Sequence, residues 1–376
     1  MKVKSAVLTE SGATSPYVES LPIKIETLDL DPPGEGEVLV NIKAASLCHS
    51  DLSVVNGTRP RPTPMALGHE ASGVVDKVGE GVHNFVPGDK VVCVFVPSCG
   101  NCLSCREGRP ALCEVGGKAN NDGTLLNGNI CLHKNGKDIY HHLGVSAFSD
   151  YVVVNKNSLV KVNNDIPFDK LALFGCAVIT GVGAVTNTAD IKFGSTVAIV
   201  GLGGVGLSAL MGAIAAGASH IIAIDINDEK LKYAKKLGAT DTFNSKDKKV
   251  IDEVLKASIG GVDYAFETAG AIAAMEVAYG ITKRGGSTVT TGLPNPEQFF
   301  SFPYVTLTAE EKSIKGSYVG SCVPQRDIPR FIDLYGQNKL PVDELHTDTI
   351  SLKEINEGFD KLENGEALRI VIDLSK

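Results

Sequence analysis

Four cysteines lie close together in the first third of the chain, in the pattern C-x2-C-x2-C-x7-C. They are Cys99, Cys102, Cys105 and Cys113. Zinc favours thiolate ligands, and gaps of two residues let a tight loop direct successive sulfurs at one ion. We therefore predict a tetrahedral zinc site in a lobe of about residues 95–115. Because four thiolates leave no ligand position open, this metal can stabilise a loop but cannot take a substrate.

A second set of metal-binding residue types is spread over three remote segments. Cys48 begins C-H-S-D, His69 lies in L-G-H-E, and Cys176 lies in F-G-C-A. Two thiolates and an imidazole would leave a fourth zinc position open, which is the arrangement of a catalytic zinc. Scattered cysteines and histidines are also common core residues, so distance in the sequence alone leaves both interpretations open.

A glycine-rich motif, G-L-G-G-V-G, stands between a predicted strand and a predicted helix. Its turn contains Gly201, Gly203, Gly204, Val205 and Gly206. Such a turn lets a dinucleotide pyrophosphate approach the backbone at the amino end of the helix. Asp225 ends the next strand, where a carboxylate can accept hydrogen bonds from a ribose and would repel a 2′-phosphate. The motif predicts NAD binding; the alternative is a turn that only packs a helix in an unrelated α/β domain.

The secondary structure that must position these residues changes along the chain, from antiparallel strands to alternating strands and helices. Early β-branched segments predict short antiparallel strands, at residues 37–46, 72–79 and 89–96. From about residue 180, strand, glycine-rich turn, helix and strand follow in the order of a βαβ unit. Further parallel strands are predicted at Val262–Glu267 and Ser287–Thr291. The tail returns to helix and strand and could rejoin the first part, while the charged run 244–256 is best explained as a solvated helix face.

Composition limits the class of protein. A length of 376 residues suggests two domains, and 43% hydrophobic with 21% charged residues is typical of a soluble globular protein. We find neither an apolar stretch of membrane-spanning length nor the apolar core of a signal peptide, so a reducing cytoplasm is expected. The net charge of −8 and the lack of a basic stripe argue against nucleic acid. We expect a cytoplasmic protein with no nucleic-acid or membrane partner.

Several motifs in one order resemble the zinc-dependent medium-chain alcohol dehydrogenases over essentially the whole chain. They are GHEASGVVDKVGEGV, the four-cysteine lobe, GLGGVG and the C-H-S-D element. The long segment GTLLNGNICLHKNGKDIYHHLGVSAFSDY resembles the branch of liver-type and glutathione-dependent formaldehyde dehydrogenases. This resemblance implies an α/β protein: a GroES-like, β-rich catalytic domain (1–178 and 320–376) and a Rossmann domain with a doubly wound parallel sheet (179–319). It also implies an active site in the cleft between the domains, and homodimers or homotetramers.

The resemblance also implies roles for individual residues. The catalytic zinc ligands are Cys48, His69 and Cys176. Glu70 lies beside this zinc, Asp51 is the partner of the ligand histidine, and Ser50 takes the alcohol proton. Cofactor contacts are implied for Asp225 and Lys230 at the ribose and for Arg369 at the pyrophosphate. The plainer alternatives are a turn serine for Ser50 and a surface arginine for Arg369.

This chain departs from the liver-type pattern at several positions. Ser53 stands where relatives often have a relay histidine, so the last step of proton exit could use water. His49 stands where many relatives have a pyrophosphate-binding arginine, which predicts looser cofactor binding. In the substrate pocket the resemblance places Phe95, Arg59 and His142. Arg59 replaces an acid that helps glutathione-dependent relatives hold their substrate; a solvent-facing arginine, and core packing for Phe95, are the alternatives.

We therefore predict an NAD-dependent zinc enzyme that oxidises primary or aromatic alcohols to aldehydes, reversibly. Its cofactors are NAD and two zinc ions per subunit, one catalytic and one structural. The metal acts as a Lewis acid toward the alcohol, whose carbon gives hydride to C4 of the nicotinamide. One alternative is an S-(hydroxymethyl)glutathione dehydrogenase. Another is a zinc-stabilised nucleotide-binding protein without catalysis.

Overall fold

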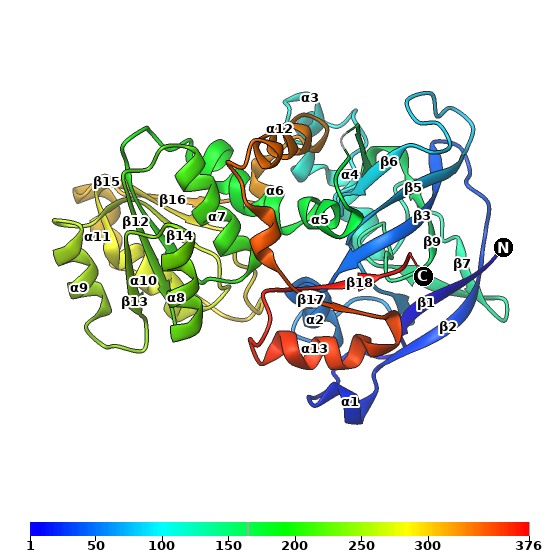
Figure 1. Cartoon of the computed structure of the whole chain (residues 1–376), viewed down its shortest axis with the longest axis horizontal. Coiled ribbons are helices and arrows are strands. Elements are labelled where there is room, and N and C mark those ends of the chain that lie inside the picture. The colour runs from blue at the N-terminus through cyan, green and yellow to red at the C-terminus, as the bar shows by residue number, and fades with distance from the viewer. Residues whose placement is uncertain (164, 376) are drawn as a thin grey trace. The chain divides into compact units, whose positions relative to one another are not determined.

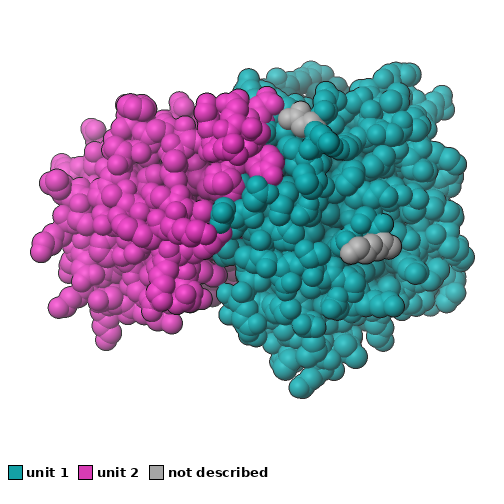
Figure 2. Space-filling view, viewed as in Figure 1, with its two compact units in different colours: residues 1–176, 323–332, 342–376 teal, residues 177–322, 333–341 magenta. Residues whose placement is uncertain are grey.

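A computed structural model describes residues 1–163 and 165–375 of the chain (Figure 1). It divides into two units, coloured separately in Figure 2. The first contains residues 1–176, 323–332 and 342–376, and the second contains residues 177–322 and 333–341. The bounds expected for the first domain, 1–178 and 320–376, differ from these: residues 177–178, 320–322 and 333–341 group with the second unit. Helix α12 (Pro324–Gly336) begins in one unit and ends in the other.

The larger sheet of the first unit has the strand order β10-β6-β5-β3-β18-β17, and β9 also pairs with β3. Its strands are β3 (Glu37–Ser46), β5 (Glu70–Val78), β6 (Lys90–Cys93), β9 (Tyr151–Asn155), β10 (Leu159–Val162), β17 (His346–Ile350) and β18 (Arg369–Asp373). The pairs β3–β5 and β5–β6 are antiparallel, so the antiparallel strands predicted there are confirmed, although β6 ends earlier than expected. The tail rejoins this unit, because β18 pairs with β3.

A second, closed sheet of the first unit follows the order β1-β2-β7-β8-β4. Its strands are β1 (Lys2–Leu8), β2 (Ile23–Leu30), β4 (Met65–Ala66), β7 (Leu132–Lys134) and β8 (Lys137–His141). The other helices of this unit are α1 (Tyr17–Ser20), α2 (His49–Val55), α3 (Leu103–Arg106), α4 (Glu114–Asp122), α5 (Phe168–Ala172) and α13 (Ile355–Glu363). Short 3-10 turns span Pro110–Leu112, Lys156–Ser158, Leu173–Gly175, Val342–Leu345 and Leu352–Glu354.

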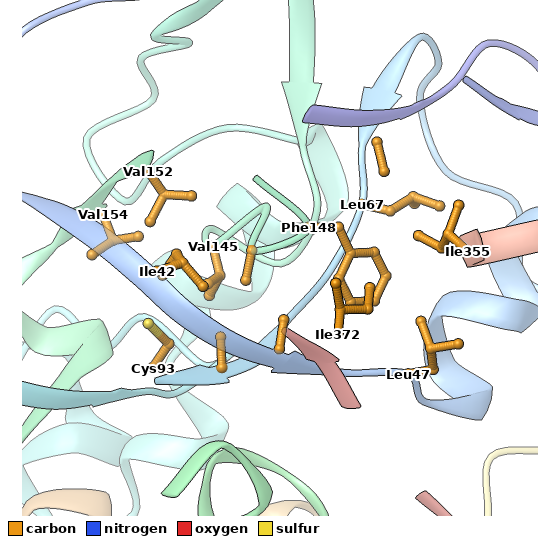
Figure 3. Close-up of a cluster of buried hydrophobic side chains, with 14 of the residues drawn as sticks. Ile42, Leu47, Leu67, Cys93, Val145, Phe148, Val152, Val154, Ile355 and Ile372 are labelled. Carbon is orange, nitrogen blue, oxygen red and sulfur yellow. The ribbon is translucent and has the colours of Figure 1, made fainter. Parts of the chain in front are cut away.

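The core of the first unit joins the beginning, the middle and the end of its sequence (Figure 3). Ile42 of β3, Phe148, Ile355 of α13 and Ile372 of β18 are fully buried in one cluster. Burying an aliphatic or aromatic side chain of this size contributes about 1.5–3 kcal/mol. The cluster therefore holds β3, β18 and α13 in a fixed arrangement, and the predicted ligand Cys48 follows β3 by two residues.

The second unit is built on a parallel sheet with the order β13-β12-β11-β14-β15-β16. Its strands are β11 (Thr196–Val200), β12 (His220–Asp225), β13 (Asp241–Asn244), β14 (Val262–Glu267), β15 (Thr282–Thr290) and β16 (Ser313–Gly316). Its helices are α6 (Ala177–Gly183), a π-helix (Ala184–Ala189), α7 (Gly204–Ala215), α8 (Asp228–Leu237), α9 (Val250–Ala257), α10 (Ile272–Ile281), α11 (Tyr304–Ala309) and a 3-10 turn (Val319–Ser321). The predicted βαβ order is confirmed. Within the charged run, α9 buries Val250 and Val254 and exposes its charges, as a solvated helix does.

Among the described residues, no single helix is both long and apolar enough to cross a membrane. One bent pair of helices, Phe168–Gly175 with Ala177–Ala189, meets the same criteria of length and composition together.

Candidate active site

The four cysteines of the first motif converge. Their sulfur atoms, from Cys99, Cys102, Cys105 and Cys113, all lie within 4.8 Å of one another. Two thiolates on one tetrahedral zinc lie about 3.8 Å apart, given a zinc–sulfur bond of about 2.3 Å. The 3.9 Å between the sulfurs of Cys102 and Cys113 matches that spacing. The cluster fits a structural zinc ion.

Backbone N–H groups of the same loop point at these sulfurs. The backbone nitrogens of Cys99 and Gly116 donate to Cys113 Sγ at 3.2 and 3.3 Å, and that of Cys102 donates to Cys99 Sγ at 3.3 Å. Backbone N–H groups of Cys105 and Glu114 lower the pKa of Cys102 to about 6. Hydrogen bonds of this kind stabilise the thiolate form, which is the form that binds metal.

The second set of ligands also meets, although its members come from remote segments. Cys48 precedes α2, His69 precedes β5, and Cys176 precedes α6. Their ligand atoms, with a carboxylate oxygen of Glu70, lie within 4.8 Å of one another, and all four residues are buried. The sulfurs of Cys48 and Cys176 are 4.0 Å apart, again close to the zinc spacing.

The backbone before His69 allows this approach. Gly68 has a φ of +98°, a conformation that residues with a Cβ atom rarely adopt. A Cβ at this position would lie 2.4 Å from the backbone nitrogen of Phe148, inside van der Waals distance. The glycine therefore lets the chain pass against Phe148 and turn His69 toward the two cysteines.

The carboxylate of Asp51 contacts two of the three ligand residues. Oδ1 of Asp51 lies 3.0 Å from Nδ1 of His69, and its Oδ2 accepts a 3.1 Å hydrogen bond from the backbone nitrogen of Cys48. With Nδ1 held in this way, Nε2 is the ring atom left to bind a metal. Nε2 of His69 is buried and makes no hydrogen bond within the described part of the chain. Buried polar atoms without partners are rare, and a zinc ion would satisfy this one.

Electrostatics at the cluster favour a cation. Burial alone would lower the pKa of His69, but the Asp51 carboxylate and the Cys48 sulfur outweigh burial and raise this pKa well above its ordinary value. The neighbouring Cys176 thiol, followed by Arg369 and His69, holds the pKa of Cys48 well below its ordinary value. Groups that favour positive charge on an imidazole favour a divalent cation for the same reason.

Arg369, at the start of β18, is only 2% exposed. Its Nε lies 3.9 Å from Oε1 of Glu70, and its Nη1 donates to the carbonyl oxygen of Leu47 at 3.3 Å. Burial would lower its pKa, but Glu70 and the two cysteines raise it. The alternative of a surface arginine is therefore excluded, because the guanidinium lies in the first unit beside the ligand cluster.

Two predicted pocket residues contact the ligand histidine. The ring of Phe95 meets the ring of His69 edge to face, with centroids 5.2 Å apart, and the ring of His142 does so at 5.5 Å. Nδ1 of His142 is also 3.1 Å from Oδ1 of Asp51. This last contact could not be predicted from the sequence, because a single histidine in a loop carries no pattern that indicates its partner.

The remaining predicted residues of this region lie on or after α2. His49 is exposed and Ser50 is partly exposed. The hydroxyl of Ser53 donates to the carbonyl oxygen of Ser50 at 2.9 Å, so Ser53 is engaged within its own helix. The side chain of Arg59 is partly exposed, and among the described residues no hydrogen bond or ion pair joins it to the ligand cluster.

In the second unit, three of the four glycines of G-L-G-G-V-G have distinct roles. Gly201 has a φ of +98°, and a Cβ on Gly206 would lie 1.8 Å from the carbonyl oxygen of Gly201. A Cβ on Gly203, by contrast, would meet no atom within 4 Å. A tight turn, an open backbone and a close helix contact are what pyrophosphate binding at this motif requires. The remaining residues of the turn, Gly204 and Val205, begin α7.

Asp225 ends β12 beside this turn. Its carboxylate accepts hydrogen bonds from the backbone nitrogens of Leu202, at 2.6 Å, and Asn227, at 2.9 Å. Lys230 lies in the first turn of α8, which Asn227 caps. The carboxylate is thus held at the strand end, where its remaining lone pairs can accept hydrogen bonds from ribose hydroxyls.

Thr268 supports this turn and Glu267 supports the loop after β14, and no sequence motif indicated either residue. The Thr268 hydroxyl donates to the carbonyl oxygen of Gly201 at 2.6 Å. Glu267 accepts hydrogen bonds from the backbone nitrogens of Ala269 and Gly270 at 2.8 and 2.6 Å. Both residues lie at the carboxyl end of β14, the strand next to β11. Ligands bind at the carboxyl ends of the strands in parallel sheets, so the position of these two residues at the end of a predicted strand could have indicated them.

Known proteins match the chain over nearly all of its length. Residues 34–164 match the family model "Alcohol dehydrogenase GroES-like domain", and residues 204–337 match "Zinc-binding dehydrogenase". The chain is 39% identical over 359 residues to the probable S-(hydroxymethyl)glutathione dehydrogenase 1 of Schizosaccharomyces pombe, a match that covers 94% of each protein. The chain belongs to the zinc-dependent alcohol dehydrogenase family.

Two solved structures of this family are similar to the chain over nearly their whole length. An alcohol dehydrogenase zinc-binding domain protein from Burkholderia ambifaria is 34% identical, with a TM-score of 0.93. The benzyl alcohol dehydrogenase from Acinetobacter calcoaceticus is 32% identical, with a TM-score of 0.92; both matches cover 99% of each chain. The predicted family, the GroES-like and Rossmann fold class and the oxidoreductase class are confirmed. Zinc and a nicotinamide dinucleotide are the cofactors of this family, and both cysteine-containing clusters fit zinc.

Proposed function

We propose that this dehydrogenase oxidises primary or aromatic alcohols to aldehydes, reversibly, with NAD. The observation that carries the proposal is the cluster of Cys48, His69 and Cys176, which offers two sulfurs and one unpartnered imidazole nitrogen. Three protein ligands leave room for a substrate, whereas the four-cysteine cluster leaves none. Zinc supplies a Lewis acid when bound at this cluster, and NAD accepts the hydride.

The side chains around the cluster have separate tasks in this proposal. Cys48, His69 and Cys176 hold the metal, and Asp51 orients two of them. The Ser50 hydroxyl, two residues after Cys48, accepts the proton of the alcohol and passes its own proton on, since a hydroxyl both donates and accepts. Phe95, packed against His69, offers an apolar ring to the body of the substrate.

NAD rather than NADP is proposed because of Asp225. A carboxylate fixed by two backbone N–H groups cannot turn away from a 2′-phosphate, and the two negative charges would repel. His49 in place of an arginine would leave the pyrophosphate with less positive charge and give faster NADH release.

A second candidate is oxidation of S-(hydroxymethyl)glutathione. The identity of 39% to the Schizosaccharomyces pombe protein supports it. The similarity to benzyl alcohol dehydrogenase supports aromatic alcohols. Arg59, which replaces an acid of the glutathione-dependent branch, favours the aromatic alcohols.

A substrate panel tests the proposal. Purified enzyme with NAD is offered benzyl alcohol, a linear primary alcohol, and formaldehyde with and without glutathione, and NADH absorbance is followed. We expect the highest kcat/KM with benzyl alcohol. Activity with formaldehyde only when glutathione is present, and above that with benzyl alcohol, would support the second candidate instead.

We further propose a homodimer or homotetramer in the cytoplasm. The strand β16 lies at the edge of the parallel sheet, and the exposed side chains nearby in sequence include Phe299, Tyr304 and Val305. An open strand edge with apolar neighbours is a common site of association between subunits. Light scattering during size-exclusion chromatography would measure the subunit number, and cell fractionation would test the location.

A further inference from the structure

Two imidazoles approach the same carboxylate oxygen. Nδ1 of His69 lies 3.0 Å and Nδ1 of His142 lies 3.1 Å from Oδ1 of Asp51. All three side chains are at most 1% exposed. We propose that His142 is a positioning residue, which holds the Asp51 carboxylate and, through it, the orientation of the metal ligand His69.

The main chain of His142 is fixed on both sides. Its backbone nitrogen donates to Ser146 Oγ at 3.0 Å and to the carbonyl oxygen of Ala66 at 3.3 Å. Its carbonyl oxygen accepts hydrogen bonds from the backbone nitrogens of Val145 and Ser146, at 3.0 and 3.2 Å. Four hydrogen bonds therefore set the point from which the imidazole extends.

The same turn contains unusual backbone conformations. Leu143 and Ser146 have φ values of 52° and 55°, in the left-handed region that residues other than glycine rarely adopt. Each such residue costs of order 1 kcal/mol or more, and such residues cluster at functional sites. Strain in the turn that follows His142 is what a turn that places this side chain would show.

The ring of His142 lies at contact distance from the charged carboxylate of Asp51. Its Nδ1 is buried, and among residues 1–163 and 165–375 no atom lies at an angle suited to a hydrogen bond with it. The charged atom beside Nδ1 is Oδ1 of Asp51, 3.1 Å away. A buried N–H is costly without an acceptor, so the attraction to this oxygen holds the ring. The rings of His142 and His69 meet at 86°, which puts both against the carboxylate from different directions.

Asp51 is thereby held at three points. Oδ2 is bound to the backbone nitrogen of Cys48, and Oδ1 lies between the two imidazoles. Without His142, Oδ1 would be held only by His69, the ring that Asp51 itself has to orient. The inference rests on the proposed function, since it requires a zinc ion on Cys48, His69 and Cys176.

The test compares two substitutions at this position. His142→Asn keeps an N–H donor near the place of Nδ1, and His142→Leu removes the donor while keeping the volume similar. For each variant and the natural protein, the affinity of the catalytic zinc is measured by chelator competition. Cobalt is then placed in the site and its thiolate and d–d bands are recorded, since they report ligand geometry without turnover.

We expect His142→Leu to weaken catalytic-zinc binding about tenfold, the lower end for loss of a group that orients a metal ligand, and to shift the cobalt bands. His142→Asn should stay within about threefold of the natural protein and keep its bands. His141→Asn is the matched control: His141 is an equally buried neighbour that accepts from the backbone nitrogen of Cys131, so its loss should leave zinc affinity unchanged. If His142→Leu does not fold, His142→Gln takes its place, with an amide displaced from the Nδ1 position.

Equal affinity and equal spectra for all variants would show that His142 only packs, and would overturn this inference alone. Equal losses in His142→Asn and His142→Leu would also overturn it, because the donor would then be irrelevant. If the natural protein retained metal only at the four-cysteine cluster, the proposed function would fail together with the inference.

Discussion

Oδ1 of Asp51 lies 3.0 Å from Nδ1 of the ligand His69, while Oδ2 of the same carboxylate accepts a hydrogen bond from the backbone of the ligand Cys48. Asp51→Asn replaces one acceptor oxygen with a donor, so one of these contacts is lost. We expect catalytic-zinc affinity to fall by about 10- to 100-fold, with the structural zinc retained, as measured by chelator competition. Asp327→Asn is the control: Asp327 is also buried and accepts a backbone N–H, from Val323, away from the cluster. Equal losses in both variants would contradict a role for Asp51 at the metal.

The two serines of α2 provide a test of proton transfer. Ser53 already donates to the carbonyl oxygen of Ser50, whereas the Ser50 hydroxyl is assigned to the alcohol proton. We expect Ser50→Ala to lower kcat by about 10²- to 10⁴-fold and Ser53→Ala to change it by less than about threefold. Steady-state kinetics across a pH series measures both. A similar kcat in the two variants would remove Ser50 from the proton path.

Asp225 is expected to select the cofactor. Asp225→Asn removes the charge that repels a 2′-phosphate and weakens the hydrogen bonds to ribose. We expect kcat/KM for NAD to fall by about 10- to 100-fold and the ratio of NADP to NAD activity to rise, since a charged hydrogen bond is worth about 1.5–3 kcal/mol. Asp241→Asn on the neighbouring strand, where the carboxylate pairs with His220, should change neither value. An unchanged cofactor ratio in Asp225→Asn would contradict the assignment.

Each cysteine of the four-cysteine cluster should be needed for one zinc ion. We expect Cys102→Ser to bind one zinc per subunit where the natural protein binds two, and to unfold at lower temperature. Elemental analysis and thermal unfolding measure this change. Cys322→Ser, at a buried cysteine outside both clusters, should keep both ions. Two retained ions in Cys102→Ser would contradict a structural zinc there.

His133 gives a pH dependence of stability that is separate from the metal sites. Burial lowers its pKa, but Asp31 and Asp138, each 3.0 Å away, outweigh burial and raise this pKa above 6.5. The stabilisation is therefore complete below about pH 6.5 and is lost as the pH rises through the raised pKa. We expect His133→Gln to lower the free energy of unfolding at about pH 5.5 by up to about 1 kcal/mol, and not at about pH 9. Denaturant unfolding at both pH values, with the exposed His83→Gln as control, checks the sign.

Local patterns in the sequence predicted part of this structure. The four-cysteine cluster and the Gly201 turn could be predicted because their residues are neighbours in the chain, so spacing alone restricts their geometry. The parallel strands β11, β12 and β14 could be predicted because buried strands form apolar runs separated by helices. Strands as short as β4 and β7 contain too few residues to show any period, and the closed sheet they complete was not predicted.

Contacts between distant segments could not be predicted in the same way. The resemblance to known dehydrogenases, rather than any spacing, indicated that Cys48, His69 and Cys176 would meet. The approach of His142 to Asp51 and the burial of Arg369 beside Glu70 depend on how several loops pack. No periodicity in a single sequence encodes such packing, so only the folded chain shows these pairs.

The pairing of β18 with β3 also has a consequence for the newly made protein. Residues 177–322 supply most of the parallel-sheet unit and leave the ribosome before β18 does. During synthesis, β3 therefore lacks this neighbour, and the guanidinium of Arg369 has not yet reached Glu70. The metal-binding half is therefore completed only after the strand that ends at Asp373 has emerged.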